Sequence, residues 1–310
     1  MTTDAGTVRI SSNRVAGLSG RVFPIVIVFL LGASECHAQR EWPKPNWKKA
    51  EGLDCRQSDK SISKPVGKYE VRLIAEPGTG AKRGPCQAYL IDPAGRESFL
   101  LEDWGISIHQ GTGWDLFGDG NPSLILEGYS GGAHCCYTYR IASLGERPVI
   151  LPPVQNEAPF YVFKDPVSRK YRIMTSDGAF DYFDGLCHAC ASMPRVVLEA
   201  DASGLHDVWA QFTEQYDSEI AAARAKIGEG NMSKFLAADF KDAKPTVLEI
   251  VYSYLYSGRE SDAWQVLDEM WPASDRERIK ALILKTRAAG ILQRIQKLRP
   301  EPMSRAQPTR

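Results

Sequence analysis

Residues 123–145 read SLILEGYSGGAHCCYTYRIASLG: a run of aliphatic residues, an irregular Gly-rich loop with cysteines, and a second run that is rich in Tyr and ends at a turn. The same order of strand, loop, cysteine, strand and turn recurs in residues 71–95, VRLIAEPGTGAKRGPCQAYLIDPAG, and in residues 171–204, YRIMTSDGAFDYFDGLCHACASMPRVVLEADASG. Short β-branched and aromatic runs bounded by Gly, Pro and Asp are typical of β-strands. They predict a mainly antiparallel β-domain over residues 66–205.

The spacing of the three units indicates a repeat. Cys86, Cys136 and Cys187 lie 50 and 51 residues apart, which is the length of one propeller blade or of a similar sheet unit. A propeller typically needs at least about four blades. We therefore expect an open sheet, a sandwich or a partial barrel that is built from about three blade-like units.

The hydrophobic period changes from two to 3.6 after His206, which predicts a C-terminal helical segment at residues 206–298. The first predicted helix ends at Gly228, the second runs from Pro245 to Gly258, and the third stops at Pro272. A capping box of Ser274 and Glu277 predicts the start of a fourth helix. The apolar positions of the first helix step by four along one face: Val208, Phe212, Tyr216 and Ile220. The predicted fold class is α+β.

The N-terminus has the pattern of a secretory signal peptide. Three arginines precede an apolar run from Val22 to Ala33, which is shorter than the roughly 20 residues that span a bilayer. Cysteine and alanine stand at the −3 and −1 positions of a cleavage site after Ala38. We predict a signal peptide at 1–38 and a periplasmic or secreted protein, and an uncleaved anchor is the alternative.

The rest of the chain contains no other stretch long and apolar enough to span a membrane, so we expect no integral membrane segment in the mature protein. Residues 39–65 have many breakers and little periodicity, and we expect an extended arm there. Residues 299–310 have the composition of a disordered tail.

The charge balance argues against a nucleic-acid partner. The chain has 38 basic and 38 acidic residues. Residues 1–38 contain three of the basic and two of the acidic residues, so the mature chain keeps 35 and 36. Nucleic acids and anionic lipid surfaces are bound by basic patches. We expect another exported or envelope protein as the partner.

Six cysteines follow the predicted cleavage site, and an even number in an exported chain predicts disulfides. We expect a Cys55–Cys86 bridge. A bond between adjacent cysteines would strain their peptide, so we expect the other four to cross-link two successive units. The six are Cys55, Cys86, Cys135, Cys136, Cys187 and Cys190.

Residues 115–124, DLFGDGNPSL, resemble the aspartate loop of FG-GAP-type repeats in exported calcium-binding β-proteins. That loop places oxygen ligands at positions one, three, five and nine, with Gly at position six before a strand. Closely spaced oxygens on such a turn suit Ca²⁺. Position three here is Phe117, which cannot ligate, so a metal-free turn of the same shape is the alternative. The resemblance implies calcium ligands at Asp115, Asp119, Asn121 and Ser123. We predict no other cofactor.

Gly128-Tyr129-Ser130-Gly131-Gly132 matches the G-x-S-x-G nucleophile elbow of α/β-hydrolases. In that fold a helix follows the serine at once, whereas β-prone residues follow Ser130. Asp184, Asp201 and His206 lie downstream in the order of the other triad members. A serine hydrolase is therefore an alternative, and a Gly-rich loop between two strands is the plain interpretation.

Cys187-His188-Ala189-Cys190 is a C-x-x-C pair, which makes a thiol–disulfide oxidoreductase a second enzymatic alternative. A zinc site that joins this pair to His134, Cys135 and Cys136 is a further alternative. Structural disulfides are the interpretation that we favour.

Residues 247–272 resemble a single tetratricopeptide hairpin, with Gly258 at the turn and Ala263 at the helix contact. A solenoid needs about three such repeats, so an ordinary helical hairpin docked on the sheet is favoured. We expect its aromatic residues to be core: Tyr252, Tyr256, Trp264 and Trp271. Taken together, the sequence predicts an exported, non-catalytic binding or scaffold protein.

Overall fold

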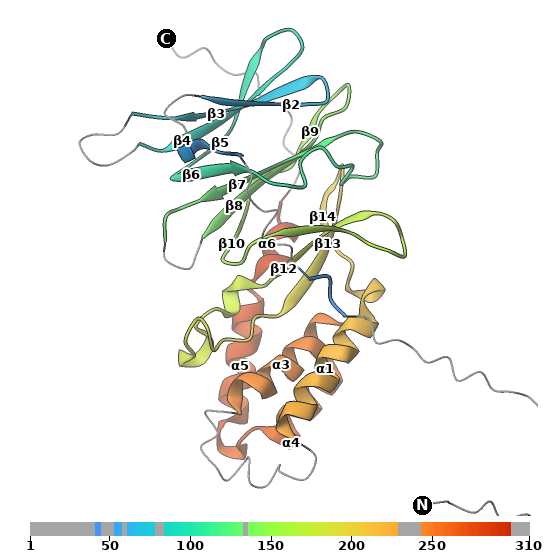
Figure 1. Ribbon diagram of the computed structural model, residues 1–310. Coiled ribbons are helices and arrows are strands. Elements are labelled where there is room, and N and C mark those ends of the chain that lie inside the picture. Colours follow the sequence, from blue (N-terminus) through green and yellow to red (C-terminus); the bar gives the residue numbers. More distant parts are fainter. Residues whose placement is uncertain are drawn as a thin grey trace, which may run out of the picture. The chain divides into compact units, whose positions relative to one another are not determined.

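The computed structural model describes residues 41–44, 53–57, 61–77, 84–132, 136–228 and 243–298. The chain divides into two units, Met1–Ala38 and Gln39–Arg310, and the fold below is that of the second (Figure 1). The predicted signal peptide (1–38) and tail (299–310) lie outside the described residues, as do His134 and Cys135. Within the described ranges, no helix combines the length and apolar character that crossing a bilayer requires.

Three antiparallel sheets follow one another along the chain. The first has the order β2-β3-β4-β5, the second β1-β6-β7-β8-β10 with β9 also paired to β8, and the third β11-β12-β13-β14. The strands of the first two sheets are β1 Leu53–Asp54, β2 Ile62–Val66, β3 Tyr69–Ala75, β4 Cys86–Ile91, β5 Glu97–Asp103, β6 Gly105–Ile108, β7 Ser123–Tyr129, β8 Tyr137–Ser143, β9 Val149–Ile150 and β10 Val154–Asn156. Those of the third are β11 Tyr161–Lys164, β12 Tyr171–Ser176, β13 Arg195–Asp201 and β14 Gly204–Asp207.

The three units of the sequence are the central hairpins of the three sheets. Residues 71–95 contain β3 and β4, residues 123–145 contain β7 and β8, and residues 171–204 contain β12 and β13. Each hairpin has a further strand on either side. The predicted α+β class is confirmed, and the repeated units form three separate sheets rather than one.

The second sheet lies between the other two and is buried on both faces (Figure 1). Leu124 and Leu126 of β7 belong to the core shared with the first sheet, and Ile125 belongs to the core shared with the third sheet and the helices. All three are at most 1% exposed. Successive side chains of a strand point to opposite faces, so the apolar run 124–126 supplies both cores.

The predicted arm at 39–65 contains two strands that the sequence did not reveal. β2 is an edge strand of the first sheet and pairs Ile62 with Leu73 of β3. Its Pro65 is tolerated because an edge strand has N–H groups that no neighbour needs. β1 pairs Asp54 with Ser107 of β6 at the edge of the second sheet. The arm is therefore part of the β-structure from Leu53 onward.

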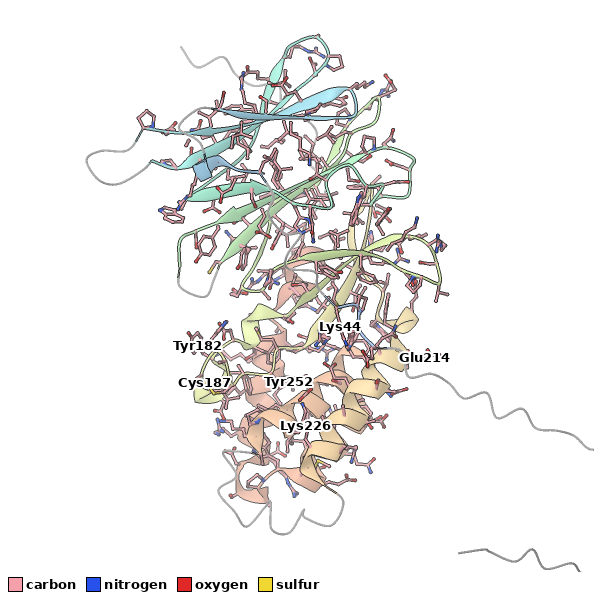
Figure 2. All side chains as sticks on the ribbon, in the orientation of Figure 1. Lys44, Tyr182, Cys187, Glu214, Lys226 and Tyr252 are labelled. Carbon is pink, nitrogen blue, oxygen red and sulfur yellow. A yellow bond between two sulfur atoms is a disulfide. The ribbon has the colours of Figure 1, made fainter. Side chains whose placement is uncertain are left out.

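Trp42 attaches the arm to the helical part of the molecule. Its ring packs edge-on against Tyr216 at 5.0 Å between centroids and stacks at 6.2 Å on Phe212. The Arg195 guanidinium lies 5.6 Å from the same ring. Lys44 is labelled in Figure 2, and its backbone carbonyl accepts a hydrogen bond from the Tyr161 hydroxyl at 3.1 Å. The arm is thus held both here and at Cys55.

Five helices are described: α1 Thr213–Ile227, α3 Lys244–Tyr256, α4 Glu260–Met270, α5 Arg276–Arg287 and α6 Ile291–Gln296. The predicted ends at Gly228, Gly258 and Pro272 are confirmed, since α1, α3 and α4 end just before these residues. The first helix starts later than predicted because the third sheet continues through β14 to Asp207.

The predicted fourth helix is two helices, α5 and α6, separated at Ala288–Gly290. A side chain at Gly290 would overlap with the Asp177 carboxylate, so the chain approaches this residue closely and turns there. The predicted capping box is also wrong. The cap of α5 is Asp275, whose carboxylate accepts from the Trp271 ring N–H and from Arg278 instead of capping the helix.

α3 and α4 form the predicted helical hairpin, with Ala263 fully buried at their contact. Gly258 has a φ of +73°, and a side chain there would come within 2.6 Å of the Trp209 ring. Among the aromatic residues of this region, Tyr252, Tyr256 and Trp271 are at most 3% exposed, as core residues should be.

We predict that Trp42→Ala lowers the free energy of unfolding by about 3 kcal/mol, because it removes a large, partly buried ring from the contact between the arm and α1. Urea unfolding followed by tryptophan fluorescence and circular dichroism measures the effect. The matched control is Trp114→Ala, which removes a 36% exposed ring stacked on Tyr171 and should cost less. Equal losses in the two variants would show that the arm is not anchored by Trp42.

Candidate functional site

Two disulfides are formed among the cysteines that the structure describes. Cys55 and Cys86, each 1% exposed, are bridged with 6.3 Å between their Cα atoms, and the bond joins the second sheet to the first. This prediction is confirmed. Cys187 and Cys190 are bridged to each other across 5.0 Å. The predicted cross-link from these two residues to Cys135 and Cys136 is therefore wrong.

The local turn explains the pairing of Cys187 with Cys190. The carbonyl of Cys187 accepts the N–H of Cys190 at 2.9 Å and that of Ala191 at 2.8 Å, so the chain makes one helical turn and brings its own two cysteines together. A separation of 5.0 Å lies within the range of about 4.4–6.8 Å that disulfides use. Since both sulfurs are consumed in the bond, they are not free to ligate zinc.

The Asp115 loop is a hydrogen-bonded turn. The carboxylate of Asp115 accepts the N–H groups of Asp119 and Gly120, each at 3.0 Å. The Asp119 carboxylate accepts from the N–H of Asn121 at 3.0 Å and from the Ser143 hydroxyl at 2.6 Å. Both carboxylates therefore help to fold the loop onto β8.

Ser123 and Phe117 of the predicted calcium loop make contacts within the chain. The Ser123 hydroxyl accepts the N–H of Leu116 at 3.0 Å, and the Phe117 ring is 8% exposed in the core. In the described part of the chain, no group of three or more His, Cys, Asp or Glu side chains could hold a metal ion. Calcium binding at Asp115, Asp119, Asn121 and Ser123 stays a prediction.

Ser130 lies in a loop between two strands, since β7 ends at Tyr129 and β8 follows. Its hydroxyl accepts the N–H of Cys136 at 3.2 Å, and its own N–H donates to the Cys136 carbonyl. The described residues of this connection, 130–132 and 136, form no helix of the kind that a nucleophile elbow requires. Among described residues, none of the downstream triad candidates Asp184, Asp201 and His206 contacts Ser130.

A different serine does meet a histidine and an aspartate, at the β13–β14 turn. His206 Nε2 lies 2.9 Å from the Ser203 hydroxyl and 3.0 Å from the Asp201 carboxylate. A catalytic triad needs one imidazole nitrogen for the serine and the other for the acid. Here the same nitrogen serves both, and Ser203 also donates to Asp201 at 2.6 Å. These three residues stabilise a hairpin turn and do not form a catalytic triad.

Asp201 and Asp207, at the two ends of this hairpin, have pKa values that are shifted in opposite directions. Slight burial raises the pKa of Asp201, but hydrogen bonds from Ser203 and His206 outweigh it and lower the value to about 2. Burial raises the pKa of Asp207 to about 6 against the hydrogen bond from the Trp209 N–H. Asp207 therefore titrates near neutral pH.

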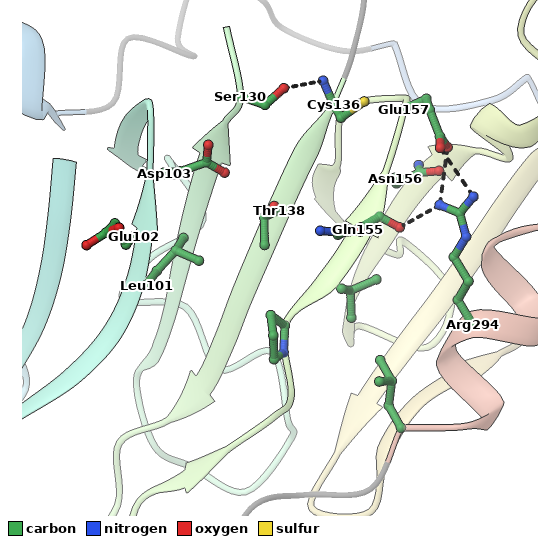
Figure 3. A pocket seen from close by; sticks show the side chains of 13 residues that line it. Leu101, Glu102, Asp103, Ser130, Cys136, Thr138, Gln155, Asn156, Glu157 and Arg294 are labelled. Carbon is green, nitrogen blue, oxygen red and sulfur yellow. Dashed lines mark hydrogen bonds and ion pairs between the residues drawn. The ribbon is translucent and has the colours of Figure 1, made fainter. Parts of the chain in front are cut away.

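A larger cavity, of about 750 Å³, opens beside β5, β8, β10 and α6 (Figure 3). Its polar lining groups are mostly engaged with the chain itself. Arg294 bonds the Glu157 carboxylate at 3.2 Å and the Gln155 carbonyl at 3.1 Å. The other residues that line the cavity are Leu101, Glu102, Asp103, Ser130, Cys136, Thr138, Pro153, Val154, Asn156 and Leu298. Because Arg294 is already paired with Glu157, the described lining residues of this cavity offer no unpaired cationic side chain to a ligand.

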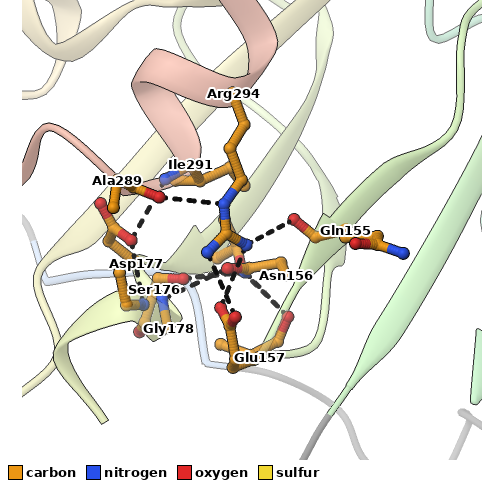
Figure 4. Close-up of polar contacts among 12 residues, drawn as sticks. Gln155, Asn156, Glu157, Ser176, Asp177, Gly178, Ala289, Ile291 and Arg294 are labelled. Atoms are coloured by element: carbon orange, nitrogen blue, oxygen red, sulfur yellow. Dashed lines mark hydrogen bonds and ion pairs between the residues drawn. The ribbon is translucent and has the colours of Figure 1, made fainter. Parts of the chain in front are cut away.

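The inner wall of this cavity is a buried polar junction (Figure 4). The Asn156 amide donates to the carbonyls of Ala158 and Ser176 and to the Thr175 hydroxyl, each at 2.9 Å, and so ties the second sheet to the third. Asp177 continues the junction toward the helices. Its carboxylate accepts the Tyr256 hydroxyl at 2.5 Å and the N–H of Ile291 at 3.2 Å. The contacts are structural.

A smaller cavity, of about 230 Å³, has a different lining: two carboxylates and three aromatic rings from four segments. The strand register explains why they meet. Asp54 pairs with Ser107, and Ser107 pairs with Glu127, so the two acids lie in one row across three strands. Tyr129 and Tyr137 pair directly in the next row. The lining residues are Asp54, Arg56, Trp104, Gly105, Ile106, Ser107, Glu127, Tyr129 and Tyr137. We refer to it as the acidic aromatic pocket.

The rings of this pocket contact one another. The Trp104 ring meets Tyr129 edge-on at 6.0 Å between centroids, and Tyr129 lies 5.6 Å from Tyr137. Trp104 is 48% exposed, which is unusual for so large an apolar side chain. The Arg56 guanidinium lies over the Trp104 ring and bonds the backbone carbonyl of the same residue.

Glu127 is the buried acid of the pocket. Its carboxylate accepts the Tyr139 hydroxyl at 2.7 Å. Burial raises the pKa of Glu127, the Tyr139 hydroxyl opposes that rise, and the negative charge of Asp54 adds to it. A cation between the two acids would remove the repulsion that Asp54 causes.

The sequence interpretation did not find this pocket. Glu127 and Tyr129 follow the apolar run at 124–126 that predicts a strand; β7 extends through both residues, and their alternation places them on one face. Asp54, however, joins them only through the pairing of β1 with β6, which no local pattern encodes. Comparison of the chain with protein-family models, with curated proteins and with solved structures found no match.

We predict that Asp207→Asn stabilises the protein at pH 8 by up to about 3 kcal/mol and has no effect at pH 4. The pKa of Asp207 is raised in the folded state, so the stability it contributes is fully present below pH 4 and is lost as pH rises through 6. Asn stays neutral and keeps the acceptor for Trp209. Urea unfolding as a function of pH measures the difference.

Asp201 provides the control, because its pKa is shifted in the opposite direction to that of Asp207. Its pKa is lowered, so Asp201→Asn should be less stable than the native protein at pH 7, and the difference should narrow as pH falls from 4 to 2. Parallel pH profiles for the two variants would contradict both assignments.

Proposed function

We propose that the chain is an exported binding protein that takes a guanidinium or ammonium group in the acidic aromatic pocket. The observation that carries the proposal is the convergence of Asp54 and Glu127 with the rings of Trp104, Tyr129 and Tyr137 on one cavity. Aromatic faces attract cations, and a desolvated site strengthens the attraction. The two acids supply the matching charge.

The charge of the pocket favours a cation over a neutral ligand such as a sugar. Asp54 of β1 and Glu127 of β7 lie on either side of Ser107 of β6 and repel each other, and this repulsion adds to the rise that burial causes in the pKa of Glu127. A neutral ligand would displace water and leave this repulsion in place. A cation would replace the lost water and pair with both acids.

Arg56 supports the choice of a planar cation. Its guanidinium lies over the Trp104 ring and donates from Nε to the Trp104 carbonyl at 3.0 Å. The pocket therefore already holds one guanidinium group, that of Arg56, against the Trp104 ring. The volume of about 230 Å³ suits one side-chain-sized cation beside it.

The leader-like N-terminus and the two disulfides support a periplasmic or secreted location, where thiols are oxidised. In that setting the cationic group is that of arginine or lysine, free or displayed on another exported or envelope protein. The chemistry is the same for both sources, so the binding experiment compares them.

We predict that L-arginine and an arginine-containing tripeptide bind the mature protein, and that Glu127→Gln weakens binding at least about tenfold, or 1.4 kcal/mol. Isothermal titration calorimetry at low and high salt measures both. Tyr137→Leu should weaken binding by removing a ring face. A tripeptide that binds more tightly than the free amino acid would favour a protein partner.

Glu102→Gln is the matched control, since it makes the same change in the lining of the larger cavity. It should bind arginine as the native protein does. Binding that is equally weak in both variants, or that is unaffected by Glu127→Gln, would rule out the acidic aromatic pocket. Binding of a neutral sugar but not of arginine would contradict the proposal that the ligand is a cation.

A further inference from the structure

The two disulfides that the described residues form differ in environment. Cys55 and Cys86 are 1% exposed in the core between two sheets, and their bond closes a separation of 31 residues. Cys187 and Cys190 are both exposed, and their bond closes a separation of three residues. A longer closed loop restricts the unfolded chain more. The second bond therefore contributes less to the fold, and it is open to attack.

The Cys187–Cys190 turn lies in the connection between β12 and β13, and other contacts fix this connection to the helices. Asp184 bonds Lys244 of α3 at 2.5 Å and Arg278 of α5 at 2.6 Å. The Ser192 hydroxyl donates to the Pro245 carbonyl at 3.1 Å. None of these contacts involves the sulfur atoms. The connection can keep its place whether the disulfide is oxidised or reduced.

An apolar anchor adds to these bonds. Phe183 is 5% exposed and packs on Phe180 at 5.4 Å between centroids and against Tyr252 at 6.0 Å. The chain around it is held in an unusual conformation, with left-handed φ values of 53° at Tyr182 and 48° at Asp184. Such positions persist only where surrounding contacts determine them, and they concentrate at functional sites.

A histidine lies in the same turn as the two sulfurs. His188 stands between the two cysteines in the sequence, and its Nδ1 lies 2.9 Å from each oxygen of the Asp181 carboxylate, which orients the ring. Histidine is one of the side chains that activate a neighbouring cysteine. Tyr182, which is 52% exposed, lies 5.9 Å from the His188 ring and on the same part of the loop as Cys187 (Figure 2).

We propose that Cys187 and Cys190 form a thiol–disulfide exchange site for cysteine thiols of another exported polypeptide, with Tyr182 as the flat surface against which that chain lies. Exposed disulfides are the ones that thiols reduce. The proposal is independent of the acidic aromatic pocket, whose residues lie on other elements.

The reaction balances without a further reagent. A partner thiolate attacks one sulfur, the Cys187–Cys190 bond breaks, a mixed disulfide forms, and the other cysteine leaves as a thiolate that takes up a proton. A second thiolate of the partner attacks the mixed disulfide and releases the first cysteine. Two electrons and two protons pass from the partner dithiol, which becomes a disulfide, to the cysteine pair, which becomes two thiols.

The first test titrates the oxidised mature protein with glutathione buffers, followed by alkylation and peptide mass spectrometry of each cysteine. We expect Cys187–Cys190 to be reduced at a ratio of reduced to oxidised glutathione at least about tenfold lower than Cys55–Cys86 requires, with an unchanged circular dichroism spectrum. Reduction of both bonds together, or only after unfolding, would overturn the proposal.

The second test mixes the oxidised protein with reduced, unfolded ribonuclease A as a probe polypeptide. We expect one probe disulfide per chain, and none with the double variant Cys187→Ser, Cys190→Ser. If glutathione reduces the bond but the probe is not oxidised, a polypeptide partner is excluded. Tyr182→Ser should slow the reaction with the probe and leave the reaction with glutathione unchanged.

His188 is a positioning residue in this proposal, and its test uses pH. In the reduced protein, the alkylation rate of the cysteine pair should rise with pH at a higher midpoint in His188→Gln than in the native protein, with the rate at pH 6 reduced about tenfold. His206→Gln, which alters the exposed β13–β14 turn, should leave the profile unchanged. Coinciding profiles for His188→Gln and the native protein would remove the role of the imidazole.

Discussion

Burial of the second sheet on both faces is the constraint on which the rest of the structure depends. The second sheet carries apolar side chains on both of its faces, and each face must be covered by another element. Leu124 and Leu126 require the first sheet on one side, and Ile125 requires the third sheet on the other. The helices then close the third sheet, and the polar groups of Asn156 and Asp177 are satisfied at the junctions that this stacking creates.

Local patterns predicted most of the fold. The three hairpins, the helical hairpin and three helix ends follow from short-range signals that the structure obeys. The errors have one physical origin, which is contact between residues far apart in sequence. β1 exists because β6 pairs with it, and the last predicted helix is broken because Gly290 meets Asp177. The C-x-x-C turn was the reverse error, where a local bond was available and distant partners were expected.

The candidate sites show how little a motif determines without its surroundings. Asp115 and Asp119 stand where calcium ligands are expected, but their oxygens accept N–H groups of the loop and the Ser143 hydroxyl of β8. Ser130 stands in an elbow motif, but a strand follows it. The acidic aromatic pocket has no motif, and its residues meet only through the register of three strands. Asp54 and Glu127 can be recognised as neighbours only when the pairing of β1, β6 and β7 is known.

The docked arm has a consequence for the order in which the chain can fold. Each sheet except for β1 is built from contiguous residues, so hairpins can form one after another as the chain is synthesised. Trp42 cannot follow this order, because its partners Phe212 and Tyr216 come about 170 residues later. Trp42 and its neighbours are therefore among the last residues to reach their folded positions. They cannot dock until α1 has been synthesised.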